Sequence, residues 1–353
     1  MKRFDSILLL VLLFAALNLT ADTTSDAFVQ QFLPNCEEAP KMDTKPFTTG
    51  IGQGMTARLV SLESGDPWCA GLWLEVTRGR LGYVGQPWIL AGYEGTVAEK
   101  IRQFAWERMK ETANATVGTK PDQFGLTPVQ VSLTTEYGRI PLEGVVDSSG
   151  EAFYPGGFIS RDASVLDQRM QMIQPLLGSA PAKTSKQTRV ELVEFSDFQC
   201  PSCRHASEWL EPLLADYGDR ITYRRVDFPL MSAHPWAFPA ALYGRAIHRQ
   251  DPDKFWLFKK EIFGNQDKLS IFSLEDFATG FVEEQGLDLS RFQRDIASQE
   301  LRDELLRGIA IGMMAEVNGT PTFWVNGKPV AVGAEGAHLR EILDLEIARE
   351  KKN

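Results

Sequence analysis

Two cysteines in the second half of the chain, Cys200 and Cys203, most constrain what this sequence can fold into. They stand in the motif Cys-Pro-Ser-Cys, between a segment rich in β-branched residues (189–195) and a helical segment that extends to Tyr217. A strand, a turn and a helix in this order place the first thiol at the helix start and the second one turn inside it. The two sulfur atoms can then form a disulfide without movement of the backbone, and this geometry favours redox cycling.

The helix start gives the two cysteines different roles. Unpaired N–H groups and the helix dipole stabilise negative charge at Cys200, so we expect it to be the nucleophilic thiolate. Cys203 is expected to be the resolving thiol, shielded within the first turn. Pro201 suits the first helical position because the N–H that it lacks would have no partner within the helix. Pro201 and Ser202 are the two active-site residues that connect the thiols.

A zinc site and an inert structural disulfide are the alternatives for this pair. Cys200, Cys203 and His205 are close in sequence, and thiolate and imidazole groups bind zinc well. The ligand count is too small, because the chain has four histidines and four cysteines and contains no second Cys-x-x-Cys motif. We therefore favour redox chemistry, with no metal and no cofactor other than a redox-active Cys200–Cys203 disulfide.

The second half of the chain is predicted to be an α/β domain that carries an all-helical insertion. A strand at 221–226 follows the first strand and helix, which is the pattern of a βαβ unit. Residues from about 236 to 317 have almost continuous helical periodicity. Two strands at 322–325 and 329–332, joined by an Asn-Gly turn, then precede a closing helix at 337–351.

The first half is predicted to be a separate, small α+β domain at 22–177. It contains no histidine, no glycine-rich phosphate loop and no nucleophile beside a visible base, so no catalysis of its own is expected. The segment 178–188 lacks apolar periodicity and is rich in small and polar residues, as in a linker. The second domain is accordingly placed at 189–353.

Residues 1–21 are predicted to be a signal peptide. A basic start is followed by the apolar run 7–17 and a small-residue cleavage site after Ala21. The run is shorter than the ~20 residues needed to span a bilayer. We expect export to a periplasmic or other extracytoplasmic location, with membrane tethering only if the signal stays uncleaved. In that oxidising compartment Cys36 and Cys69 form either a structural disulfide or two unpaired buried thiols.

The charge balance argues against binding to nucleic acid. Lysine and arginine number 37 and the acidic residues number 47, which leaves a formal net charge of −10. Such a chain has no general attraction for polyanions or for anionic membranes. The balance does not discriminate for or against polypeptide substrates.

Two segments together resemble a known family. They are Val-Glu-Phe-Ser-Asp-Phe-Gln-Cys-Pro-Ser-Cys at 193–203 and Val-Asn-Gly-Thr-Pro-Thr-Phe-Trp-Val-Asn-Gly at 317–327. With the helical insertion between them, they look like the DsbA-type branch of the thioredoxin superfamily, the exported thiol–disulfide oxidoreductases. The resemblance covers roughly 189–350 and implies a thioredoxin-like fold.

The resemblance also implies roles for three residues outside the Cys-Pro-Ser-Cys motif. The Thr320–Pro321 peptide bond would be cis, with Pro321 against the Cys200 sulfur and the Thr320 backbone available to an extended substrate chain. Glu194 would be a buried acid beneath the disulfide that exchanges a proton with Cys203, whereas the alternative is a solvated glutamate at the edge.

The resemblance implies partners and leaves the direction of the reaction open. The substrates would be unfolded or partly folded exported polypeptides, and a membrane redox partner would restore the active form. The Pro-Ser dipeptide lacks the histidine of strongly oxidising relatives, and Thr320 resembles the isomerase branch as much as the oxidase branch. Isomerases carry an N-terminal dimerisation domain, so a homodimer through 22–177 is one expectation. The alternative function is a protein-binding or chaperone module in which the redox pair is secondary.

Overall fold

The computed structural model describes residues 23–67, 69–183 and 188–351 of the chain. The predicted signal peptide, 1–21, lies outside the described residues. Within them, no helix is both long and apolar enough to cross a membrane.

The N-terminal half, defined as residues 23–177, contains two antiparallel sheets with the strand orders β1-β2-β3-β4-β10 and β5-β9-β8-β7-β6. Its elements are α1 (Thr23–Gln30), β1 (Lys41–Pro46), β2 (Thr56–Glu63), β3 (Gly71–Arg78), β4 (Leu81–Gly85), β5 (Trp88–Ile89), α2 (Val97–Phe104), a π-helical turn (Ala105–Met109), β6 (Thr112–Val117), β7 (Thr127–Thr135), β8 (Gly138–Val146), β9 (Ala152–Pro155), β10 (Ile159–Ser160) and α3 (Val165–Leu177).

The remaining residues contain a third sheet with the order β11-β13-β12-β14-β15. Its elements are β11 (Ala182–Lys183), β12 (Glu191–Ser196), α4 (Pro201–Tyr217), a 3-10 turn (Gly218–Arg220), β13 (Thr222–Asp227), α5 (Ala237–Gln250), α6 (Pro252–Gly264), a 3-10 turn (Gln266–Lys268), α7 (Leu274–Glu284), α8 (Leu289–Ile296), α9 (Gln299–Met314), β14 (Thr322–Val325), β15 (Lys328–Val330), a 3-10 turn (Ala334–Gly336) and α10 (Ala337–Glu350).

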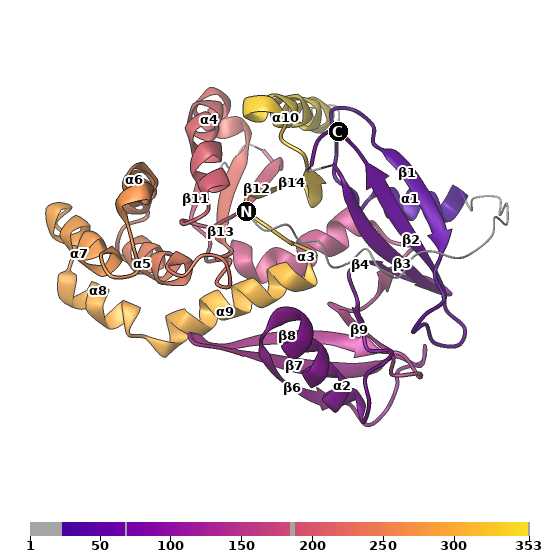
Figure 1. Ribbon diagram of the computed structural model, residues 1–353. Helices are drawn as coiled ribbons and strands as arrows, with labels where there is room; N and C mark the ends of the chain where they lie inside the picture. The colour runs from indigo at the N-terminus through magenta and orange to yellow at the C-terminus, as the bar shows by residue number, and fades with distance from the viewer. Residues whose placement is uncertain (1–22, 68, 184–187, 352–353) are drawn as a thin grey trace.

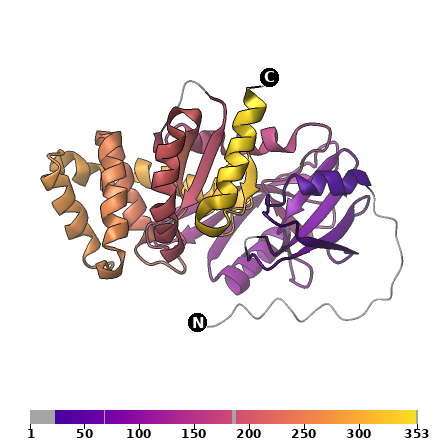
Figure 2. The same ribbon diagram turned by 90° about the horizontal axis from the view of Figure 1, so that it is seen from above.

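The third sheet has the mixed topology that joins a βαβ unit to a hairpin. Strand β12 pairs in parallel with β13 and antiparallel with β14, and β14 pairs antiparallel with β15. The side chains of β12 alternate between two buried faces. Leu192 packs with α4 and α10, which Figure 2 shows side by side, whereas Val193 and Phe195 pack into the core on the other face.

Helices α5 to α9 occupy the connection between β13 and β14 (Figure 1). Two of their boundaries follow from capping chemistry. The Asp251 side chain accepts hydrogen bonds from the first turn of α6, where Pro252 takes the first position, and the Ser298 side chain caps α9. Phenylalanine side chains such as Phe255, Phe258 and Phe292 then fill the space between these helices.

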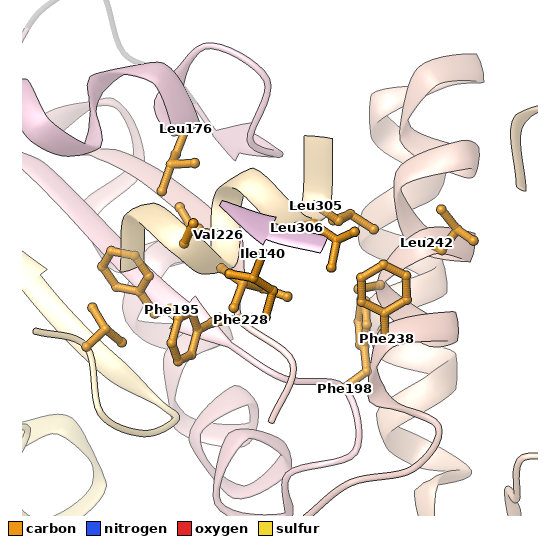
Figure 3. Close-up of a cluster of buried hydrophobic side chains, with 14 of the residues drawn as sticks. Ile140, Leu176, Phe195, Phe198, Val226, Phe228, Phe238, Leu242, Leu305 and Leu306 are labelled. Carbon is orange, nitrogen blue, oxygen red and sulfur yellow. The ribbon is translucent and has the colours of Figure 1, made fainter. Parts of the chain in front are cut away.

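One hydrophobic core joins the N-terminal half to the third sheet and its helices. Figure 3 shows the cluster, in which Ile140 of β8, Leu176 of α3, Phe195 of β12, Phe238 of α5 and Leu306 of α9 are all buried. Each of these elements has one apolar face, and the apolar faces pack against one another. Sequence periodicity finds such faces but does not tell which partner covers each of them.

Part of the predicted linker, 178–188, is paired with the third sheet. Within it, Ala182 and Lys183 form β11, which pairs antiparallel with Arg224 and Tyr223 of β13. The backbone N–H of Arg225 donates to the carbonyl oxygen of Pro181 at 2.9 Å. The edge of β13 would otherwise leave backbone groups unpaired, and Ala182 and Lys183 pair with it.

Candidate active site

Cys200 and Cys203 lie at the start of α4, the helix that follows β12. Cys200 is the N-cap residue of α4, Pro201 and Ser202 form the first turn, and Cys203 lies one turn inside the helix. Both cysteines are free thiols and both are buried. The segment Asp197–Cys203 is called the active-site loop below.

The cis peptide bond between Thr320 and Pro321 lies directly against this loop. It is the bond that the sequence resemblance implied to be cis. The Cys200 thiol donates a hydrogen bond to the Thr320 carbonyl oxygen, with the sulfur and oxygen atoms 3.3 Å apart. The structure therefore brings together Cys200, Cys203, Thr320 and Pro321, which come from opposite ends of the domain.

The two thiols have strongly different acidities. A hydrogen bond from the Cys203 thiol, together with the Thr320 side chain and the backbone N–H groups of Ser202 and Cys203, lowers the pKa of Cys200 to about 6. Burial acts against this shift but does not cancel it. Burial is the main reason that the pKa of Cys203 is raised, and the negative charges of Cys200 and Glu194 add to it. At neutral pH the site holds one thiolate and one thiol.

Glu194 lies on β12 and is completely buried, so it is not a solvated edge residue. The Tyr223 hydroxyl donates to Glu194 Oε2, and Oε1 has no hydrogen-bond partner. Its neighbour across the strand ladder is Arg225, which is also fully buried and donates to Asp227. Glu194 is thus a buried acid close enough to Cys203 to raise the pKa of that thiol.

In the described part of the chain, no group of three or more histidine, cysteine, aspartate or glutamate side chains gathers in a metal-binding arrangement. His205, considered with the cysteines from sequence, is exposed and faces Glu208.

The chain shows similarity to known proteins over its second half. The family model described as Thioredoxin matches residues 182–345. The Probable disulfide bond formation protein D of Bacillus cereus is 32% identical over 144 residues, which cover 39% of this chain and 66% of that protein. The protein of the same name from Bacillus anthracis is 29% identical over 166 residues, which cover 45% of this chain and 75% of that protein. The second half of this chain is a DsbA-type thiol–disulfide oxidoreductase domain of the thioredoxin superfamily.

Other proteins are similar to part of this chain. The Na(+)/H(+) antiporter NhaA 1 of Mycolicibacterium vanbaalenii is 33% identical over 138 residues, and the match spans only 21% of its length. Among solved structures, BdbD from Bacillus subtilis aligns with a TM-score of 0.43 at 19% identity, covering 49% of this chain and 95% of that one. The thiol-disulfide exchange protein α-DsbA2 of Wolbachia pipientis aligns with a TM-score of 0.44 at 19% identity, covering 51% and 95%.

Asp197 and His234 belong to the active site of the DsbA-type domain, although sequence analysis did not select them as a pair. Asp197 Oδ2 lies 2.7 Å from Nδ1 of His234 and also accepts the N–H of Leu230 at 2.9 Å. The hydrogen bond to Asp197 is the main cause of the raised pKa of His234, and the Cys200 charge adds to it. The two residues are far apart in sequence, so only the fold reveals that they meet beside Cys200, whose charge favours the protonated form of His234.

Gln266 is a second site residue that sequence analysis missed. Its Nε2 atom donates to the carbonyl oxygens of Phe198 and Cys200, at 2.9 Å and 3.1 Å. Nearby, Arg204 of α4 and Asp267 form an ion pair at 2.5 Å. The helical segment of the DsbA-type domain therefore holds the backbone of the active-site loop in place.

Cys36 and Cys69 form a disulfide bond, with Cα atoms 6.0 Å apart. It joins the segment before β1 to the connection between β2 and β3. This segment also reaches the edge of the third sheet, because Asn35 forms a bridge with Val330. The two cysteine pairs are separate features: one is a crosslink in the N-terminal half, and the other is the thiol pair of the DsbA-type domain.

Proposed function

We propose that this protein is an exported thiol–disulfide oxidoreductase that oxidises cysteine pairs in polypeptides through its Cys-Pro-Ser-Cys centre. The observation that carries the proposal is the difference in acidity between Cys200, with a pKa lowered to about 6, and the buried Cys203, whose pKa is raised. Stabilisation of the Cys200 thiolate favours the reduced form of the pair. The oxidised pair is consequently the reactive form, which supports the oxidising direction.

The proposed reaction has two exchange steps. A substrate thiolate attacks the Cys200 sulfur of the Cys200–Cys203 disulfide, so a substrate–Cys200 bond forms and Cys203 leaves with the electron pair. A second substrate thiolate then attacks the substrate sulfur of this mixed disulfide. The substrate disulfide forms and Cys200 leaves as a thiolate. The substrate loses two electrons, the cysteine pair gains them, and no further cofactor takes part.

Glu194 has a place in the first of these steps. Cys203 leaves as a thiolate in a buried position that disfavours charge, so it must take up a proton. Glu194 is completely buried, and its Oε1 atom is free of hydrogen bonds. We assign Glu194 as the group that relays this proton between Cys203 and solvent.

The cis-proline residues define the substrate class in this proposal. Thr320 is buried with its carbonyl oxygen against Cys200, so its backbone lies where an extended peptide can pair beside the reactive sulfur. Recognition through backbone groups suits unfolded or partly folded exported polypeptides of varied sequence. In the oxidising direction, a membrane oxidant would be the partner that restores the disulfide.

The test uses Cys200→Ser and Cys203→Ser variants of the full chain beside the wild type. Wild-type protein, oxidised beforehand, is expected to introduce disulfides into reduced ribonuclease, whereas Cys200→Ser protein should have no such activity. Cys203→Ser protein, mixed with glutathione disulfide, should accumulate a glutathione adduct on Cys200 that intact-mass measurement detects. Full oxidase activity in Cys200→Ser protein would refute the proposal.

A further inference from the structure

Glu316 ends α9 in a backbone conformation that usually belongs to glycine. Its φ angle is 64°, in the left-handed region. The N–H groups of Glu316 and Val317 donate to the carbonyl oxygens of Met313 and Gly312, which is the Schellman pattern that closes a helix. Glycine is the usual residue at this position, because a side chain there raises the conformational free energy of the backbone. The contacts of the Glu316 side chain must offset this increase.

Those contacts come from the N-terminal half. The Tyr83 hydroxyl of β4 donates to Glu316 Oε1 at 2.8 Å, and the backbone N–H of Gln86 donates to Oε2 at 3.0 Å. Gly85 leaves the room for this carboxylate, because a Cβ atom there would lie 2.1 Å from Oε1. Figure 1 shows the end of α9 at this junction, next to β4.

Glu316 also lies a few residues before the site. The cis-proline loop, defined as residues 317–321, runs directly from Glu316 to Thr320 and Pro321. The Thr320 carbonyl oxygen accepts the hydrogen bond of the Cys200 thiol at 3.3 Å. One end of this loop is therefore held by the N-terminal half and the other end lies against the reactive sulfur.

We propose that Glu316 is a positioning residue, through which the N-terminal half holds the cis-proline loop against Cys200. This inference rests on the proposed function and gives the N-terminal half a part in it. The groups that face the Glu316 carboxyl are Tyr83 from β4, the Gln86 backbone and the buried Arg169 from α3. A carboxylate displaced from these donors leaves the start of the loop without its anchor.

Three variants of the full chain disturb this anchor in different ways. Gly85→Ala pushes the carboxylate out of its place without changing Glu316, Tyr83→Phe removes one donor, and Glu316→Gln keeps the size of the side chain but removes the charge. The matched controls are Gly65→Ala, where a Cβ meets no neighbour, and Tyr93→Phe, whose hydroxyl also bonds a glutamate but stays within the N-terminal half.

The first readout is the thiolate absorbance of the reduced protein at about 240 nm as a function of pH. Because the Thr320 side chain helps to lower the pKa of Cys200, a displaced loop should move the absorbance midpoint upward in all three variants. The second readout is ribonuclease oxidation, for which KM should rise on the order of tenfold and kcat should change less. Both controls should match the wild type in both readouts.

The outcomes separate this inference from the proposed function. The absorbance titration needs no substrate, so it reports on Glu316 even if the wild type lacks oxidase activity. A merely structural role would lower the thermal midpoint and leave the absorbance midpoint unchanged. If the variants that fold, as judged by circular dichroism, keep the wild-type absorbance midpoint and KM, the inference is wrong. Glu316→Gln and Tyr83→Phe decide the matter if Gly85→Ala fails to fold.

Discussion

Glu316 gives the protein a defined dependence of stability on pH. Burial raises the pKa of its carboxyl from the ordinary value of 4.5 to about 7, although Tyr83, Gln86 and Arg169 act in the opposite direction. Because the folded protein prefers the protonated carboxyl, this contribution to stability is complete below about pH 4.5 and is lost as the pH rises to about 7. A pKa difference of about 2.5 corresponds to about 3 kcal/mol.

Glu316→Gln removes this titration while it keeps the volume of the side chain. The free energy of unfolding, measured by urea denaturation with tryptophan fluorescence, should therefore change with pH differently in the two proteins. We expect the wild-type value minus the variant value to fall by about 3 kcal/mol between about pH 4.5 and pH 8. Other titrating groups are common to both proteins and cancel in this difference.

A control accounts for the loss of one acidic side chain. Glu107→Gln removes an exposed glutamate that also accepts a hydrogen bond from a tyrosine hydroxyl. The free energy of unfolding of Glu107→Gln protein is measured over the same pH range and subtracted from the wild-type value. If the wild-type and Glu316→Gln profiles run parallel from about pH 4.5 to pH 8, the reasoning about the buried carboxyl is refuted.

Three further outcomes follow from the site and the core. At about pH 7, iodoacetamide should alkylate Cys200 and spare Cys203, and the rate of alkylation should rise as the pH passes about 6. Peptide mass spectrometry measures the labelling of each cysteine, and equal labelling of the two would contradict this prediction. His234→Gln should raise the absorbance midpoint of the Cys200 thiolate, because a positive charge is lost nearby; a midpoint that stays or falls would contradict it. A fragment of residues 182–353 lacks Ile140 and Leu176, which belong to the shared core. It should therefore bind a hydrophobic dye and unfold at a lower temperature than the full chain. A fragment as stable as the full chain would show that the halves are independent.

The DsbA-type domain could be predicted closely because its signals are local. The Asn-Gly turn between β14 and β15, the Asp251 cap of α6 and the strand–motif–helix order around Cys200 each depend on residues within a few positions of one another. The edge strands β5, β10 and β11 have two residues each, and so short a strand carries no periodicity that a sequence could show.

The residues around Cys200 already specify much of the chemistry of the reaction centre. A cysteine before Pro201 at a helix start becomes the acidic thiol, since the groups that lower its pKa lie mainly within the first turn of the helix. The burial that raises the pKa of Cys203 comes from the packing of the surrounding elements. Only the tertiary structure decided what surrounds the pair. Asp197 meets His234, Glu194 meets Tyr223, and Glu316 meets Tyr83 across long stretches of chain. The packing of apolar faces selects these contacts, and a linear pattern does not specify which faces meet.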